Sequence, residues 1–97
     1  MADTVVTVAQ FPKNARHVCR ITLREYRRHH LFDLRIFWPD QATESYLPMR
    51  QGIALDVKLF PAFKRAVLML EQVLKDEYAL TDEDLNAADI TTFSEEG

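Results

Sequence analysis

Apolar and polar side chains alternate along residues 17–26 of the chain. The two sets of positions fall on opposite sides of a predicted strand, Cys19, Ile21 and Leu23 against Arg20, Thr22, Arg24 and Tyr26. A period of two with one apolar side is typical of a strand that is buried on one face only. We therefore predict a strand here, with a cationic polar side that ends in an aromatic residue.

Three other segments have strand character. Residues 5–9 form a short β-rich run that Pro12 ends, which favours an edge strand. A basic turn is predicted at residues 27–30, an apolar strand at 31–38, a turn at 39–43 and a fourth strand at 45–55. Within the last strand, Pro48 indicates an edge position or a bulge, and Gly52 indicates a bulge or a close approach of two backbones.

From about residue 56 the apolar positions follow a helical period, and the regular helix is expected to begin near Pro61. Apolar side chains then cover about half of the helix circumference, more than one small sheet needs for its core. We infer a homodimer, while deep packing of one helix on its own sheet remains an alternative. The side chains predicted at the dimer interface are Phe63, Val67, Leu70, Val73 and Leu74.

Beyond Tyr78 the chain becomes acidic. Thr81 is expected to cap a short helix that runs to about Ala88, and residues 94–97 are expected to be disordered. We accordingly divide the chain into an α+β domain at residues 1–78 and an acidic extension at residues 79–97.

Charge is distributed unevenly along the 97 residues. Residues 11–65 carry eleven basic and five acidic side chains, a net charge of +6, whereas residues 66–97 carry one lysine and nine acidic side chains, a net charge of −8. Such asymmetry indicates binding to nucleic acid or to a membrane surface, or simply a solvated surface with an acidic tail.

The predicted strands combine arginines with aromatic side chains. Single-stranded nucleic acid offers a phosphate chain for cations and unstacked bases for aromatic rings. Tyr26, Phe37 and Trp38 could supply the rings. Phe37 and Trp38 could instead be core residues, but neighbours on a strand face opposite sides, so at least one should leave the core. The predicted binding residues in this basic region are Lys13, Arg16, Arg20, Arg24, Tyr26, Arg27, Arg28, Arg35, Phe37 and Trp38.

We identify no catalytic constellation, cofactor motif or metal-ligand spacing in the sequence. His17, His29 and His30 are interpreted as turn residues, and Asp33 as the ion-pair partner of an arginine rather than a general base. Cys19 is the only cysteine and is expected to be a small hydrophobic residue rather than a nucleophile. No apolar stretch is long enough to span a bilayer and no signal peptide is recognised, so we expect a cytoplasmic, nucleoid-associated protein that is not an enzyme.

Four stretches resemble the transcriptional coactivator family called positive cofactor four, in its compact bacterial form. They occur in the family's order, at residues 11–13, 21–26, 31–38 and 47–55, the last leading into the helix. The resemblance implies a curved four-stranded antiparallel sheet followed by a C-terminal helix. It also implies that two such units pair through their helices and that the paired sheets carry single-stranded DNA.

The same resemblance implies roles for individual residues. Tyr26 and Arg27 match the aromatic and basic residues that end the second strand of the family, Arg35 and Trp38 match third-strand residues, and Arg50 matches a basic residue near the glycine. The chain departs from the family in two places. Gln51 stands where a lysine is common, although we keep Gln51 among the candidate contacts, and residues 27–30 lack the usual glycine.

We therefore predict that the protein binds single-stranded DNA without sequence preference, with RNA as an open alternative. Its role would be in transcription regulation, with the transcription machinery as a further partner. An adaptor that binds protein through the same basic face is the alternative. The acidic residues after position 75 could compete with DNA for this face, with Phe93 imitating a base, or could merely keep the protein soluble.

Overall fold

The computed structural model describes residues 5–93, and the predicted disorder of residues 94–97 lies outside this range. The chain forms two compact units. The sheet unit comprises residues 5–57 together with 90–93, and the helical unit comprises Lys58–Asp89. Residues 90–93 of the acidic extension therefore belong with the sheet.

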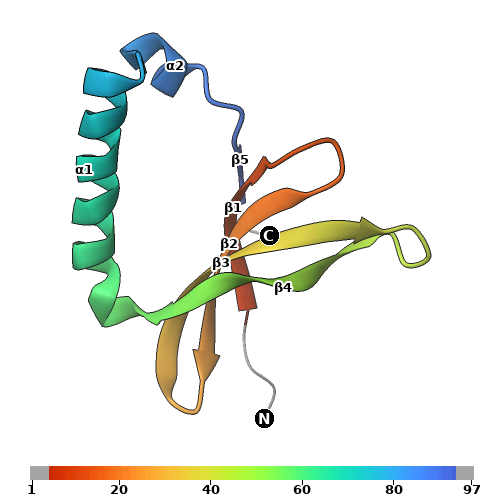
Figure 1. The fold of residues 1–97 in the computed structure, drawn as a ribbon. Helices are drawn as coiled ribbons and strands as arrows, with labels where there is room; N and C mark the ends of the chain where they lie inside the picture. Colours follow the sequence, from red (N-terminus) through yellow and green to blue (C-terminus); the bar gives the residue numbers. More distant parts are fainter. Residues whose placement is uncertain (1–4, 94–97) are drawn as a thin grey trace. The chain divides into compact units, whose positions relative to one another are not determined.

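The sheet unit is an open antiparallel sheet in the order β4-β3-β2-β1-β5 (Figure 1). Its strands are β1 (Val5–Pro12), β2 (Val18–Tyr26), β3 (His29–Asp40), β4 (Ser45–Asp56) and β5 (Thr91–Thr92). The four predicted strands are confirmed, each with somewhat different ends. The two-residue β5 is an addition, and it pairs with β1, so β1 is not the outermost strand that the sequence suggested.

Strand register separates the side chains into two faces, because residues paired across antiparallel strands lie on the same side. Arg20 pairs with Arg35, and Thr22 pairs with Asp33. Their side of the sheet, which also bears Arg24, Tyr26, Phe37 and Tyr46, is called the arginine face below. The opposite apolar face carries Cys19, Ile21, Leu23, Phe32, Leu34 and Ile53. The predicted alternation of β2 is thus confirmed.

A bulge interrupts the pairing of β3 with β4. Gly52 lies opposite Arg35, but the next pair along the strands joins Pro48 to Phe37, so β4 has extra residues at this point. A Cβ atom on Gly52 would lie 2.7 Å from the carbonyl oxygen of Leu34 and 2.8 Å from the Cα of Arg35. Both interpretations of Gly52, the bulge and the close backbone approach, are therefore correct, and Pro48 lies on an edge strand as expected.

Two arginines form the turn between β2 and β3. Arg27 and Arg28 have φ angles of 52° and 69°, and Tyr26 pairs with His29. Positive φ at both central positions of a two-residue loop is the type I′ geometry that favours Asn and Gly. The predicted turn at residues 27–30 was two residues too long, because His29 and His30 already belong to β3.

The helical unit contains α1 (Phe60–Glu77) and α2 (Asp82–Asn86), and the 3-10 turn η1 (Val57–Leu59) precedes α1. Pro61 lies in the first turn of α1, where its missing N–H costs nothing. Thr81 and Asp84 form a capping box at α2, as the sequence predicted for Thr81, and the Lys75 ammonium lies 2.9 Å from Asp82. In residues 5–93 no helix is both long and apolar enough to cross a membrane.

Candidate nucleic-acid interface

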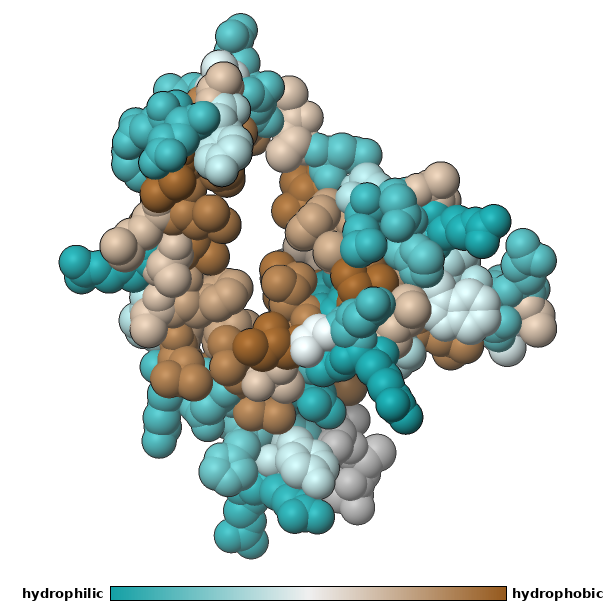
Figure 2. Space-filling model, viewed as in Figure 1, coloured by the Kyte–Doolittle hydropathy of each residue, from teal (hydrophilic) through white to brown (hydrophobic). Residues whose placement is uncertain are grey.

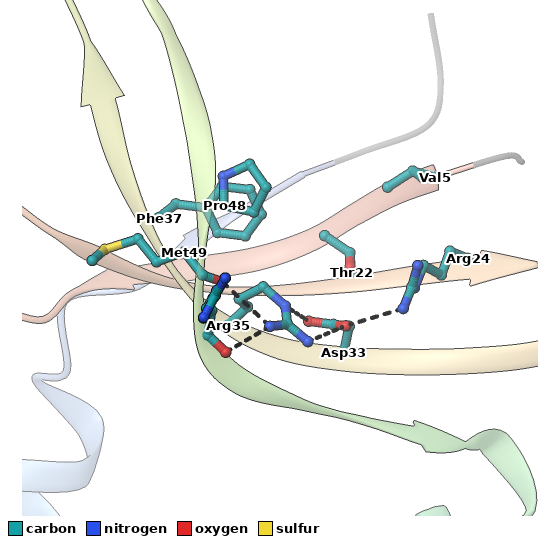
Figure 3. Close-up of a pocket in the computed structure, with 9 residues that line it drawn as sticks. Val5, Thr22, Arg24, Asp33, Arg35, Phe37, Pro48 and Met49 are labelled. Carbon is teal, nitrogen blue, oxygen red and sulfur yellow. Dashed lines mark hydrogen bonds and ion pairs between the residues drawn. The ribbon is translucent and has the colours of Figure 1, made fainter.

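A groove of about 440 Å³ crosses the arginine face (Figure 3). Strands β1 to β4 all contribute to it, and its lining includes both cationic and apolar side chains. Four of the predicted binding residues meet here, namely Arg24, Arg35, Phe37 and Arg50. The groove therefore brings cations next to an aromatic ring, as single-stranded nucleic acid requires.

Arg35 joins two strands at the centre of the groove. Its Nε and Nη2 donate to the two carboxylate oxygens of Asp33 at 2.9 and 3.1 Å, and its Nη1 donates to the carbonyls of Met49 and Arg50 at 3.3 and 3.0 Å. The hydrogen bonds to Asp33 raise the pKa of Arg35. The predicted ion pair of Asp33 is confirmed. Two of these four hydrogen bonds therefore hold the bulge of β4 against β3, and the other two fix the guanidinium on Asp33.

The guanidinium of Arg24 makes fewer contacts with the protein than that of Arg35. The Nη2 of Arg24 lies 3.7 Å from Asp33, too far for a hydrogen bond, and its buried Nε has no hydrogen-bond partner among residues 5–93. Because that Nε is buried, an incoming acceptor would meet the other donors of this guanidinium, whose side chain is 35% exposed. The side chain of Arg50 is exposed on the bulge, beside exposed Gln51. Arg24 and Arg50 are therefore the groove cations best able to bind an anion.

Aromatic rings surround Arg20. Its Cζ lies 4.8 Å from the ring centre of Phe37, 4.9 Å from that of Tyr46 and 5.9 Å from that of Phe93. Its Nε donates to the side-chain oxygen of Gln10 at 3.0 Å. Burial lowers the pKa of Arg20, and the guanidinium still carries its charge at neutral pH. We call Phe37, Tyr46 and Phe93 the Arg20 cage.

A second basic cluster lies at the β2–β3 turn. Tyr26 is 43% exposed, and the Cζ of Arg27 lies 5.1 Å from its ring centre. Arg28 is exposed beside it. This turn offers one ring and two cations to solvent, although the backbone must hold both arginines in a left-handed conformation.

Trp38 lies apart from the other aromatic residues of the candidate site. It pairs with Leu47 and follows Phe37 along β3, so it is directed to the face opposite Phe37. It is 42% exposed and lines a concavity of about 680 Å³ with Arg16 and His17. Lys13 is exposed in the same β1–β2 loop. The expectation that Phe37 and Trp38 point to opposite sides is confirmed, and the predicted residues form separate clusters.

The model of the family described as Transcriptional Coactivator p15 (PC4) matches residues 13–66, which is more than half of the chain. The chain belongs to the PC4 family. The resemblance found in the sequence is therefore confirmed, and an open antiparallel sheet followed by a helix is the PC4 fold. Members of the PC4 family are DNA-binding, non-enzymatic proteins associated with transcription.

Two solved PC4 homologues resemble the chain. The crystal structure of one from Burkholderia pseudomallei has 28% identity and a TM-score of 0.64, covering 73% of this chain and 95% of its own. The bacteriophage T5 homologue of the eukaryotic coactivator PC4, implicated in recombination-dependent DNA replication, has 16% identity and a TM-score of 0.56. That match covers 90% of this chain and 93% of its own, and shows the fold alone. No curated protein matches the sequence.

Sequence reasoning found the cations of this PC4-family site but missed part of their surroundings. Gln10 and Tyr46, which contact Arg20, were not among the candidates, and Phe93 was considered only as a base mimic. Tyr46 pairs with Pro39 across the β3–β4 turn, which places it on the arginine face. Its role follows only from the register of that turn, which no local pattern reveals.

Proposed function

We propose that this PC4-family protein binds single-stranded DNA without sequence preference and acts in transcription regulation as a coactivator-like protein. The carrying observation is the groove in which the Arg24 side chain, 35% exposed and 3.7 Å from Asp33, lies with Arg50 and the ring of Phe37. This arrangement suits a flexible strand that presents phosphates and bases together. The proposal places the protein in the cytoplasm, at the nucleoid, and gives it no catalytic role.

Phosphate groups would be held by the cations that have free donors. Arg24 and Arg50 lie in the groove, and Arg27 and Arg28 are exposed at the β2–β3 turn. Arg35 is proposed to act mainly by placing Arg50, since four hydrogen bonds already engage its guanidinium. None of these groups reads a base edge in this proposal, so binding would be independent of sequence.

Bases would stack on Tyr26 and Trp38, whose rings are exposed. His29, which pairs with Tyr26, and Trp38 lie at opposite ends of β3, about 30 Å apart along the strand. The two rings also lie on opposite faces of the sheet. A short oligonucleotide would reach only one of them, so affinity should increase stepwise with strand length.

We further propose that the protein is a homodimer through α1. Apolar side chains are exposed along this helix (Figure 2). Met69 is 65% and Leu70 is 56% exposed. Val67 and Val73 are exposed as well, and Phe63 and Leu74 are half-buried. Burying this much apolar surface against the same helix of a second copy would stabilise both chains.

The test is binding to single-stranded and double-stranded oligonucleotides of equal length over a series of salt concentrations. We expect tighter binding to the single strand, because a duplex hides the base faces. Arg24→Gln should weaken binding and reduce the slope of log affinity against log salt by about 0.7 for each phosphate that is no longer neutralised. The matched control is Lys64→Gln on the polar side of α1, which should leave both quantities unchanged. Equal affinity for both DNA forms would contradict the proposal, and affinity independent of strand length would favour a protein-binding adaptor.

A further inference from the structure

The C-terminal segment of the sheet unit occupies the outer edge of β1. In β5, Thr91 pairs with Gln10 and Thr92 pairs with Ala9. The N–H of Phe93 donates to the carbonyl of Val8 at 3.1 Å, at the point where β1 shifts register. The acidic extension thus returns to the basic sheet and is held there by backbone hydrogen bonding.

This pairing directs Phe93 to the arginine face. Thr91 shares a face with Gln10, and side chains alternate along a strand, so Phe93 lies on the same side as Thr91. Its ring completes the Arg20 cage, 5.9 Å from the Cζ of Arg20. Of the three rings in the cage, only that of Phe93 comes from outside the β3–β4 hairpin. Withdrawal of β5 would therefore open one side of Arg20 without disturbing the hairpin.

We propose that residues 91–93 are a displaceable strand that competes with single-stranded DNA for Arg20. A nucleobase stacks on a guanidinium as a phenyl ring does, and the two cannot occupy the same side of Arg20 together. In the sequence, Phe93 is followed by Ser94 and then by two glutamates, which are negatively charged like the phosphates of DNA. This inference rests on the proposed binding of single-stranded DNA and adds a built-in restraint on it.

The segment is weakly attached, as a competitor must be. Strand β5 has two residues, and Thr91, Thr92 and Phe93 are all exposed. Elements with few buried contacts open at low free-energy cost. If the strand is closed in roughly 90% of molecules, the apparent affinity for DNA falls about tenfold, because only the open fraction can bind at Arg20.

The test compares full-length variants in binding to oligothymidylate. Phe93→Ala removes the ring, and Phe93→Pro removes both the ring and the N–H that donates to Val8. Both should raise the affinity, by up to about tenfold. The matched control is Ile90→Ala, which removes an exposed apolar side chain just before β5 and should have no effect. When Arg20 is also changed to Ala, Phe93→Ala should give no further gain, because the contested cation is gone.

A second readout is hydrogen exchange of the Phe93 amide. We expect its protection to be lost when oligothymidylate is added to the unmodified chain. If the unmodified chain binds DNA but Phe93→Ala binds equally or more weakly, the competition is overturned and the proposed function stands. If neither the unmodified chain nor any variant binds single-stranded DNA, both proposals fall.

Discussion

Replacing Arg35 with alanine should destabilise the sheet unit. The substitution leaves the buried Asp33 side chain, 7% exposed, with Arg24 at 3.7 Å as its remaining ion-pair partner within residues 5–93. It also removes the donors that hold the carbonyls of Met49 and Arg50. Breaking a buried ion pair by removing one partner costs about 3–5 kcal/mol. Because the Arg35 side chain is 22% exposed and Arg24 can partly replace it, we expect the lower end, about 3 kcal/mol.

The assay is urea denaturation followed by circular dichroism at one fixed protein concentration, since dimerisation would make stability depend on concentration. Arg50→Ala is the matched control, because its side chain is exposed and the decrease in stability should stay within about 0.5 kcal/mol. Arg35→Lys should fall between the two, since lysine keeps the charge but lacks the fork that engages both carboxylate oxygens. A decrease below about 1 kcal/mol for Arg35→Ala would refute the reasoning that Arg35 holds the bulge.

Four further changes test other features. Leu70→Glu should yield monomers or insoluble protein in analytical ultracentrifugation, whereas Lys64→Glu should not; a soluble monomer of the unmodified chain would contradict the proposed dimer. Gly52→Ala should lower the free energy of unfolding by about 1–3 kcal/mol, because the new Cβ would meet the backbone of β3; unchanged stability would show that the strands can separate at no cost. Arg28→Gly should raise the free energy of unfolding by about 0.5–1 kcal/mol, since glycine tolerates a φ of 69°, and it should weaken DNA binding. A decrease in stability would contradict the idea that Arg28 strains the backbone of the turn. Hydrogen bonds from Thr81 lower the pKa of Asp84. The contribution of Asp84 to stability should therefore be complete above the pKa of an unfolded aspartate and should disappear as the pH falls through the lower pKa of the folded state. The readout is the Thr81 amide resonance, and a resonance insensitive to acid would argue against the capping box.

The regular elements could be predicted because their signals are local. Alternation identified β2 and its two faces, and the helical period with Pro61 located the start of α1. Gly52 and Pro48 indicated an irregular edge strand from residue type alone. In each case the physical cause lies within a few residues of the signal.

The remaining features depend on partners distant in the sequence. Strand β5 has two residues, too few for any period, and exists because Ala9 and Gln10 offer an edge. The role of Arg35 depends on carbonyls of β4 that only the bulge brings within reach. The number of arginines in the sequence therefore predicted the charge of the site. It did not predict which guanidinium already donates its hydrogen bonds within the protein.

The bulge of β4 also bears on how copies of this chain can meet. An edge strand exposes a row of backbone donors and acceptors that can pair with another chain, which is a common route to fibres. On β4, Pro48 has no N–H to offer, and the carbonyls of Met49 and Arg50 accept hydrogen bonds from Arg35. The middle of this edge is therefore a poor template for an added strand. The hydrogen bonds from Arg35 that shape the groove thus also reduce the acceptors that this edge offers to another chain.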